Sequence, residues 1–171
     1  MRIALPDGSD ASVGQAGEIL VAGPNVMQGY WNNPVATAEA IRGRWFHTGD
    51  IGRCDAAGNL YVVDRLKDMI NTAGLKVYPA EVEAVLLQHP LVKEAGVFGV
   101  PDDIVGERVG ARVVLEADAE LSAAALANFC RSKLAPYKVP ELVEFAPHLP
   151  RNATGKLLRR VLRDEALVPT S

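Results

Sequence analysis

The sequence changes its pattern after residue 64, and this change is the strongest constraint on the fold. Before that point, short β-type runs such as 17–23 and 60–63 alternate with turn residues. After it, runs with helical spacing alternate with β-rich runs. The helical runs are 79–87, 122–134 and 156–166, and the β-rich runs are 92–100, 109–115 and 142–145. The sequence therefore predicts an α+β fold.

The pattern also predicts two structural parts. Residues 65–171 are enough for one compact domain of about 100 residues, with mixed small sheets and about three helices. Residues 1–64, with one short helix expected at 36–41, are interpreted as the distal β-rich end of a larger N-terminal domain. We therefore place a domain boundary between residues 64 and 65.

The composition excludes several classes of protein. Hydrophobic residues make up 49% of the 171 residues, which is enough to bury a core, so wholesale disorder is excluded. Two cysteines cannot form a disulfide framework, and no Cys/His cluster indicates a zinc site. The sequence contains no signal-peptide pattern and no long apolar run, so we expect no transmembrane segment and a cytoplasmic location.

The charge distribution narrows the choice of partners. A net charge of −3 argues against general nucleic-acid binding, because domains with that function are usually strongly basic. Residues 151–163 nevertheless contain five Lys or Arg residues and no acidic residue. Such a stretch is either a solvated helix face or a phosphate contact, and taken alone it favours the solvated face.

A first candidate motif is the string WFHTGD at residues 45–50. An ionised carboxylate only accepts hydrogen bonds, so Asp50 beside a small glycine could hold both hydroxyls of a ribose diol. Gly-Asp pairs also form ordinary turns, and this alternative stays open for the motif by itself.

A second motif, DRLKDMI followed by NTAGLKVYPAEVE, begins where the pattern changes and covers residues 64–83. Arg65 offers a planar, permanently charged set of donors that suits hydroxyls or phosphates. Gly74 permits close approach of a ligand to the backbone. The alternative is a charged hairpin that only links two domains.

The third motif, PRNATGK, places Lys156 after a glycine-containing loop and at the expected start of the last helix. The helix dipole opposes a cation there, so the position suits a lysine that reaches an anion elsewhere. The glycine spacing of a Walker A loop is missing. A fourth string, MQGYW at residues 27–31, is expected to form a loop with buried aromatic side chains.

Together, in this order and with these spacings, the four motifs resemble the adenylate-forming superfamily. This superfamily contains acyl-CoA synthetases, adenylation domains of nonribosomal peptide synthetases and beetle luciferases. The resemblance runs from Gly17 to Leu162 and is specific in combination, although each motif alone is weak. It implies the C-terminal part of an acid–thiol ligase, which converts a carboxylic acid, ATP and CoA into acyl-CoA, AMP and pyrophosphate through an acyl-adenylate.

The resemblance also implies roles for five residues. Asp50 matches the aspartate that holds the ribose hydroxyls of ATP, and Arg65 matches the arginine that assists it. Lys156 matches the catalytic lysine of adenylation. Lys67 matches the hinge about which the mobile C-terminal lid domain rotates between the two half-reactions, and Gly74 matches a glycine that lines the pantetheine tunnel for CoA.

Several features of the superfamily are altered or missing. Ala73 stands where a second glycine is common, and Asn71 replaces a lysine of luciferases, which weakens a luciferase interpretation. The phosphate loop, the acyl pocket and the acidic motif that binds Mg²⁺ do not occur in these residues. The resemblance therefore places the Mg²⁺ ligand in a missing N-terminal part, implies no metal site here, and predicts that the fragment alone is inactive.

The sequence also predicts a class of substrate and several partners. The string AGLKVYP at 73–79 favours a medium- or long-chain fatty acid, with aromatic or short dicarboxylic acids left open. Arg131, Lys133 and Lys138 are candidates for binding CoA phosphates, although an ordinary solvated face is favoured for each. The predicted protein partners are the missing N-terminal domain and a lysine acetyltransferase and deacetylase acting on Lys156, because acetylation would remove its charge.

Two alternative functions stay open at this point. The first is an adenylation domain that loads a carrier protein. The second is a non-catalytic binding or regulatory module with the same fold, which the presence of Asp50, Arg65 and Lys156 together argues against.

Overall fold

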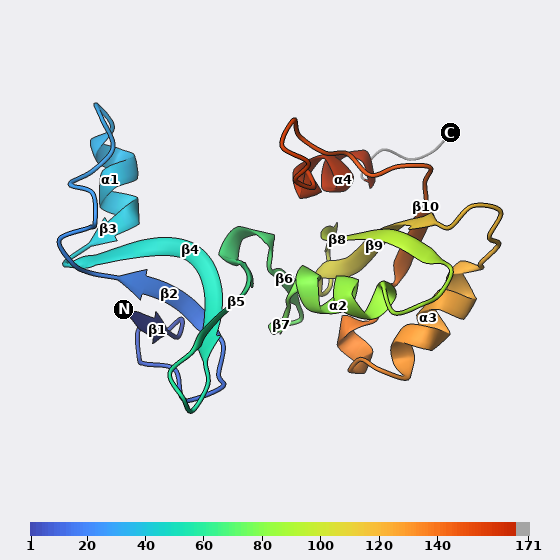
Figure 1. Cartoon of the computed structure of the whole chain (residues 1–171), viewed down its shortest axis with the longest axis horizontal. Helices are drawn as coiled ribbons and strands as arrows, with labels where there is room; N and C mark the ends of the chain where they lie inside the picture. The colour runs from blue at the N-terminus through green and yellow to red at the C-terminus, as the bar shows by residue number, and fades with distance from the viewer. Residues whose placement is uncertain (167–171) are drawn as a thin grey trace. The chain divides into compact units, whose positions relative to one another are not determined.

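The structure is a computed structural model that describes residues 1–166. It contains two compact units, the first covering Met1–Lys67 and the second beginning at Asp68 (Figure 1). The first unit includes Arg65 because strand β5 (Leu60–Arg65) continues to that residue and stays paired with strand β4 (Trp45–Cys54). The assignment of the two units to domains of a larger enzyme stays a prediction.

The N-terminal unit is built on one antiparallel sheet of five strands, ordered β1-β2-β4-β3 with β5 also paired to β4. Its other elements are β1 (Arg2–Ala4), β2 (Gly17–Val21), helix α1 (Pro34–Ala40) and β3 (Ile41–Arg42). The side chain of Asn33 caps α1 by accepting the Ala36 N–H, and Pro34 suits the first helical turn. The helix expected at 36–41 is confirmed, two residues earlier at its start.

The C-terminal unit contains a second sheet of five strands, ordered β10-β9-β6-β7 with β8 also paired to β9. The strands are β6 (Ile70–Thr72), β7 (Leu75–Val77), β8 (Val92–Asp102), β9 (Gly106–Leu115) and β10 (Leu142–Phe145). Strand β10 runs parallel to β9, and the other pairings are antiparallel.

The helices of this unit are α2 (Pro79–Leu86), α3 (Ala123–Arg131) and α4 (Arg159–Ala166), with 3-10 turns η1 (Leu66–Asp68) at the unit boundary and η2 (Pro136–Lys138). The predicted α+β fold is confirmed.

Within residues 1–166, no helix has both the length and the apolar character needed to cross a membrane.

Helices pack against both faces of the second sheet (Figure 1). On one face, Val97 of β8 joins a core that includes Val82 of α2 and Leu126 of α3. On the other face, Phe98 packs in a separate cluster with Leu162 of α4. Successive side chains of a strand point to opposite faces, so the neighbours Val97 and Phe98 belong to different clusters. Helix α4 is therefore held by its own apolar contact with the sheet.

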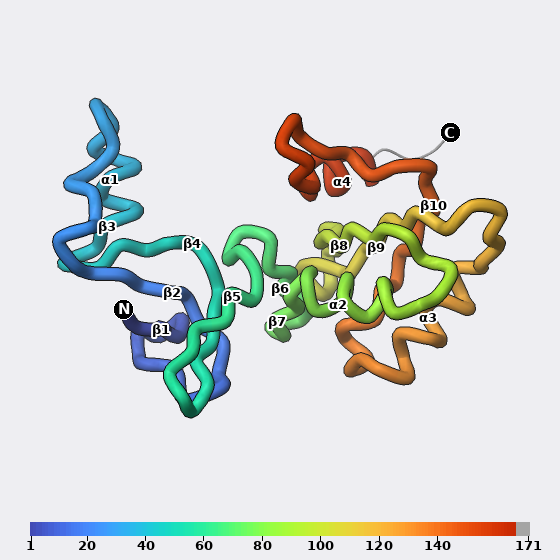
Figure 2. Tube along the Cα trace, viewed as in Figure 1, coloured from blue at the N-terminus to red at the C-terminus, as the bar shows by residue number. Residues whose placement is uncertain are grey.

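The last helix starts later than the sequence predicts. It begins at Arg159, after a turn that Figure 2 shows between β10 and α4. The backbone N–H of Lys156 donates to Asn152 Oδ1 at 2.8 Å, and that of Leu158 donates to the Pro150 carbonyl at 2.9 Å. These bonds close a turn where a helix was expected, so Lys156 does not sit at a helix N-terminus. The helix-dipole argument for this lysine is wrong.

Candidate active site

Asp50 and Arg65 face each other on the adjacent strands β4 and β5 of the N-terminal unit. Arg65 Nε lies 2.8 Å from Asp50 Oδ1, and the two side chains keep 46% and 33% of their surface exposed. Directly opposed residues of antiparallel strands are close neighbours, so the strand register itself forms this pair. The pair offers an anionic acceptor and a cationic donor to solvent, which is the chemistry that a ribose diol can use.

A bulge in β4 sets the position of Asp50. Leu20 pairs with His47 and Glu18 pairs with Ile51, so β4 contains extra residues between these two points. Gly49 within the bulge has a φ of 70°, a left-handed conformation that favours glycine. Bulges of this kind redirect side chains and are common beside active sites. Here the bulge takes Asp50 out of register with β2, while its pairing with β5 is kept.

Glu18 supports this bulge, although no sequence motif predicted a role for it. Its carboxylate lies 2.8 Å from His47 Nδ1 through Oε2 and accepts the Gly49 N–H at 3.2 Å through Oε1. The Thr48 hydroxyl adds a donation to the Ile19 carbonyl at 2.8 Å and accepts the Asp50 N–H at 3.1 Å. The partners of Glu18 are distant in sequence. The one local sign that Glu18 has a special role is its position, as an acidic residue at the start of the apolar run GEILV.

Lys156 is exposed in the turn between β10 and α4 of the C-terminal unit. The Asn152 side chain shapes this turn, because Oδ1 accepts the N–H groups of Thr154 and Lys156 at 3.0 and 2.8 Å and the Thr154 hydroxyl at 2.8 Å. Within residues 1–166, the Lys156 ammonium forms no ion pair, whereas Arg151 and Arg159 of the same basic stretch bind carboxylates. The lysine amine is therefore available to an external anion.

The two other predicted residues lie in separate elements. Lys67 is exposed in η1, at the boundary between the two compact units. Gly74 and the preceding Ala73 form the two-residue turn between β6 and β7, with φ of 83° and 50°. Left-handed values at both positions are typical of type I′ hairpin turns. A Cβ on Gly74 would meet no atom within 4 Å. The left-handed backbone conformation, and not a lack of space, therefore explains a glycine at this position within the unit.

The three candidates for CoA phosphates already have partners in the C-terminal unit. Lys138 Nζ lies 2.7 Å from both carboxylate oxygens of Glu81. Arg131 donates to the Asn128 side chain at 2.5 Å, and the Lys133 ammonium lies 5.2 Å from the Phe129 ring centroid. Arg131 and Lys133 are exposed, in agreement with the solvated face that the sequence favoured, whereas the Lys138 side chain is only 18% exposed and is held by Glu81.

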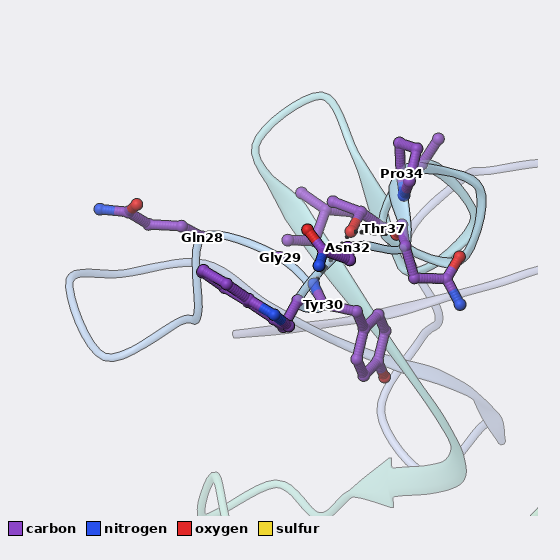
Figure 3. A pocket seen from close by; sticks show the side chains of 10 residues that line it. Gln28, Gly29, Tyr30, Asn32, Pro34 and Thr37 are labelled. Atoms are coloured by element: carbon purple, nitrogen blue, oxygen red, sulfur yellow. Dashed lines mark hydrogen bonds between the residues drawn. The ribbon is translucent and has the colours of Figure 1, made fainter.

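Residues 28–31 of the MQGYW string help to line a hollow of about 700 Å³ on the N-terminal unit (Figure 3). The Tyr30 N–H donates to Thr37 Oγ1 at 2.9 Å, and a Cβ on Gly29 would approach Thr37 Cγ2 to 2.7 Å, so glycine is required there. Tyr30 and Trp31 are 48% and 92% exposed. The prediction of buried aromatic side chains is wrong, because no element within residues 1–166 covers this loop.

The described residues offer little for metal binding or thiol chemistry. Within residues 1–166, no group of three or more His, Cys, Asp and Glu side chains could hold a metal ion. Cys130 is buried in the main core, and burial raises the pKa of its thiol, which makes it a poor nucleophile.

Comparisons with known proteins give a consistent pattern. The family model of the AMP-binding enzyme C-terminal domain matches residues 81–156. A 2-succinylbenzoate–CoA ligase of Geobacillus kaustophilus is 57% identical over 93% of this chain and 32% of its own length. A long-chain-fatty-acid–CoA ligase of Escherichia coli O157:H7 is 51% identical over 94% of this chain and 28% of its own length. The chain thus spans about a third of such relatives. The crystal structure of ATP-bound MatB from Rhodopseudomonas palustris superposes with a TM-score of 0.90, at 38% identity over 96% of this chain and 33% of that protein.

Proposed function

Because this chain belongs to the AMP-binding enzymes and carries their C-terminal domain, we propose that it is the C-terminal part of an ATP-dependent acyl-CoA ligase. The reaction has two half-reactions. A carboxylate oxygen first bonds to the α-phosphorus of ATP while the bond to the leaving pyrophosphate breaks. The thiol sulfur of CoA then bonds to the acyl carbon of the adenylate, and AMP leaves.

In the adenylation step, the N-terminal unit supplies nucleotide binding. Asp50 accepts hydrogen bonds from the ribose hydroxyls, and Arg65, already 2.8 Å from it, orients the carboxylate and adds a donor. Lys156 supplies the positive charge that stabilises negative charge on the phosphate and carboxylate oxygens in the transition state. We place the ligands of the Mg²⁺ that accompanies ATP upstream of this chain.

In the thioester-forming step, the C-terminal unit changes its orientation about Lys67. Lys156 then leaves the nucleotide, and the β6–β7 turn with Gly74 lines the path of the pantetheine arm. The exposed position of Lys67 in the 3-10 turn between the units is compatible with such a rotation, since its side chain is not packed in either core.

The main support for this proposal is that the Lys156 ammonium group is exposed and has no ion-pair partner within residues 1–166. The loop around it is nevertheless ordered by Asn152, and its neighbours Arg151 and Arg159 are paired. A fixed loop that presents an uncompensated cation is suited to an anionic substrate, because little reorganisation is needed when the anion arrives.

The test uses the longer enzyme that carries this chain as its C-terminal part. Wild-type enzyme should catalyse acid-dependent ATP–pyrophosphate exchange and form acyl-CoA, whereas the 171 residues alone should do neither. Asp50→Asn should raise KM for ATP, because a carboxylate acceptor becomes a weaker neutral amide. Arg44→Gln, an exposed change on the same unit, is the matched control. A full-length enzyme that forms no acyl-adenylate from any carboxylic acid would contradict the proposal.

For the acid itself, we propose a medium- or long-chain fatty acid. The support is the AGLKVYP string together with the 51% identity to a long-chain-fatty-acid–CoA ligase. The 57% identity to a 2-succinylbenzoate–CoA ligase makes an aromatic dicarboxylic acid the alternative to be tested beside it. Comparing kcat/KM for dodecanoate, palmitate, benzoate and 2-succinylbenzoate with the longer enzyme decides between them.

We also propose that Lys156 is regulated by reversible acetylation of a cytoplasmic enzyme. Its exposed side chain is reachable by an acetyltransferase, and acetylation would remove the charge that adenylation uses. Mass spectrometry of the native protein should detect acetyl-Lys156 under some growth condition. Consistent absence of the modification would contradict this proposal.

A further inference from the structure

One guanidinium group joins three elements of the C-terminal unit. Arg159 is the first residue of α4, and its Nη2 donates to the two carboxylate oxygens of Glu83 on α2 at 2.9 and 2.8 Å. Its Nη1 lies 3.8 Å from Asp68 Oδ2 in η1. The three side chains are only 14–19% exposed, so water screens their attraction less than it would on the surface.

Glu83 is a firm point of attachment. Its Oε1 also accepts the Val97 N–H of β8 at 2.9 Å, so helix α2, the central sheet and α4 share this carboxylate. Helix α4 is further fixed by the side chain of Leu162, which is fully buried. Leu162 packs closely on Gly96 of β8, because a Cβ atom on that glycine would lie 2.8 Å from Leu162 Cδ1. The end of the loop that carries Lys156 is therefore attached to the rest of the unit by both charge and packing.

The start of the same loop is attached through a second arginine. Arg151 Nη2 lies 2.5 Å from Glu94 Oε2 on β8, and Nη1 donates to the Gly155 carbonyl at 2.8 Å. A β-bridge between Arg151 and Leu157 closes the loop. Lys156 is thus exposed at the tip of a loop whose two ends are both fixed. The two arginines differ in one respect, because within residues 1–166 only Arg159 also contacts Asp68.

We infer that Arg159 is a positioning residue for Lys156. Asp68 directly follows Lys67, so Arg159 links the lysine-bearing loop to the first residue beyond the proposed hinge. The loop and that segment then move as one body when the unit rotates, and the amine arrives at the nucleotide in a fixed place. This inference rests on the proposed function, because it concerns how Lys156 is delivered for adenylation.

The residue type fits this role. A guanidinium has several donors in a rigid plane and can contact two carboxylates at once, whereas a lysine ammonium acts as a single point charge. Delivery of a catalytic group must be accurate, since a displacement of about 1 Å can lower a rate roughly 100-fold. Loss of Arg159 should therefore affect the step that uses Lys156 more than the step that does not.

The experiment measures the two half-reactions separately in the longer enzyme. For Arg159→Gln, the adenylation rate should fall roughly 100-fold with KM for ATP nearly unchanged, because Asp50 and Arg65 are untouched. Conversion of supplied acyl-adenylate and CoA to acyl-CoA should stay near the wild-type rate. Arg159→Lys should recover part of the adenylation rate. Asp68→Asn, which leaves the Glu83 pair intact, should cause a smaller fall in adenylation with no change in melting temperature.

Arg160→Gln is the matched control. Arg160 is the next residue of α4, and its side chain is 91% exposed and pairs only with Asp164 within residues 1–166, so both half-reactions should stay at the wild-type rate. A parallel loss of both half-reactions and of melting temperature in Arg159→Gln would make Arg159 merely structural and overturn the inference. Unchanged adenylation in Asp68→Asn and Arg159→Gln would also overturn it. A wild-type enzyme that forms no acyl-adenylate would instead contradict the proposed function.

Discussion

The two compact units differ in how much apolar surface they bury. The core of the N-terminal unit is limited to five residues: Ile3, Ala4, Ile19, Leu20 and Ile51. Both hydrophobic clusters of the described chain lie in the C-terminal unit, on the two faces of its sheet. Burial of apolar surface is the main driving force of folding. The C-terminal unit therefore has a core of its own, whereas within residues 1–67 only these five apolar side chains are buried.

The units also differ in how they hold their candidate functional groups. Asp50 and Arg65 are placed by the register of two paired strands and by a bulge supported from Glu18. Lys156 is placed at the tip of a loop that depends on side-chain contacts of Arg151 and Arg159. A sheet suits a binding group that stays in place, and an anchored loop suits a cation that is delivered.

Separating the two units should change the stability of the protein more than any single substitution. A protein of residues 68–171 should fold alone and unfold cooperatively, while residues 1–67 alone should lack a stable fold, because so few of their side chains are buried. Circular dichroism with thermal unfolding and amide proton dispersion in NMR spectra measure this. Cooperative unfolding of both pieces, or of neither, would contradict the contrast.

A smaller effect is expected from the packing of α4. Leu162→Ala should lower the free energy of unfolding of the C-terminal unit by about 2–5 kcal/mol, because Leu162 is fully buried against the sheet. Leu158→Ala, at a position that is 36% exposed, should cost about 1 kcal/mol or less. Urea unfolding of both variants gives the comparison. Equal losses would show that α4 is not held by its apolar contact.

The smallest effect is expected on how stability depends on acid pH, and it concerns one turn aspartate in each unit. Backbone donation from Val105 and Ile104, then the contact with Arg108, holds the pKa of Asp102 below its ordinary 3.8. Hydrogen bonds from Asn59 do the same for the pKa of Asp55. A lowered folded-state pKa stabilises the fold above the ordinary value, and this stabilisation is lost as the pH falls through the folded-state pKa.

In the 171-residue protein, Asp102→Asn should therefore weaken the acid dependence of the stability of the C-terminal unit, whereas Asp55→Asn, in the other unit, should leave it unchanged. NMR signals of Val97 and Leu126, which belong to the C-terminal core, follow this unfolding as the pH is lowered. An equal change in both variants would mean that the stability of the C-terminal unit is coupled to the N-terminal unit.

Local sequence signals predicted most elements of the C-terminal unit. Helix α2 covers Pro79–Leu86 against an expected 79–87, because Pro79, Glu81 and the apolar spacing all act within the segment. Strand β10 covers the expected residues 142–145. The start of α4 was missed because Leu157 and Leu158 continue the helical spacing, while the Asn152 side chain binds the backbone and delays the helix.

Contacts between distant residues could not be predicted in the same way. The bulge at Gly49 depends on the pairing of β4 with two other strands, and Glu18 reaches it across the sheet. The Arg159–Glu83 pair joins residues 76 positions apart. In both cases the motif indicates a candidate functional residue, and tertiary structure determines which residues support it.

In the proposed mechanism, Lys156 serves adenylation and not thioester formation. The most direct test is Lys156→Ala in the longer enzyme, with ATP–pyrophosphate exchange and CoA-dependent turnover of supplied acyl-adenylate measured on the same preparation. We expect ATP–pyrophosphate exchange to fall about 100- to 1,000-fold, as for removal of one group that stabilises transition-state charge, with thioester formation near the wild-type rate. Exchange at the wild-type rate, or an equal loss of both half-reactions, would contradict it.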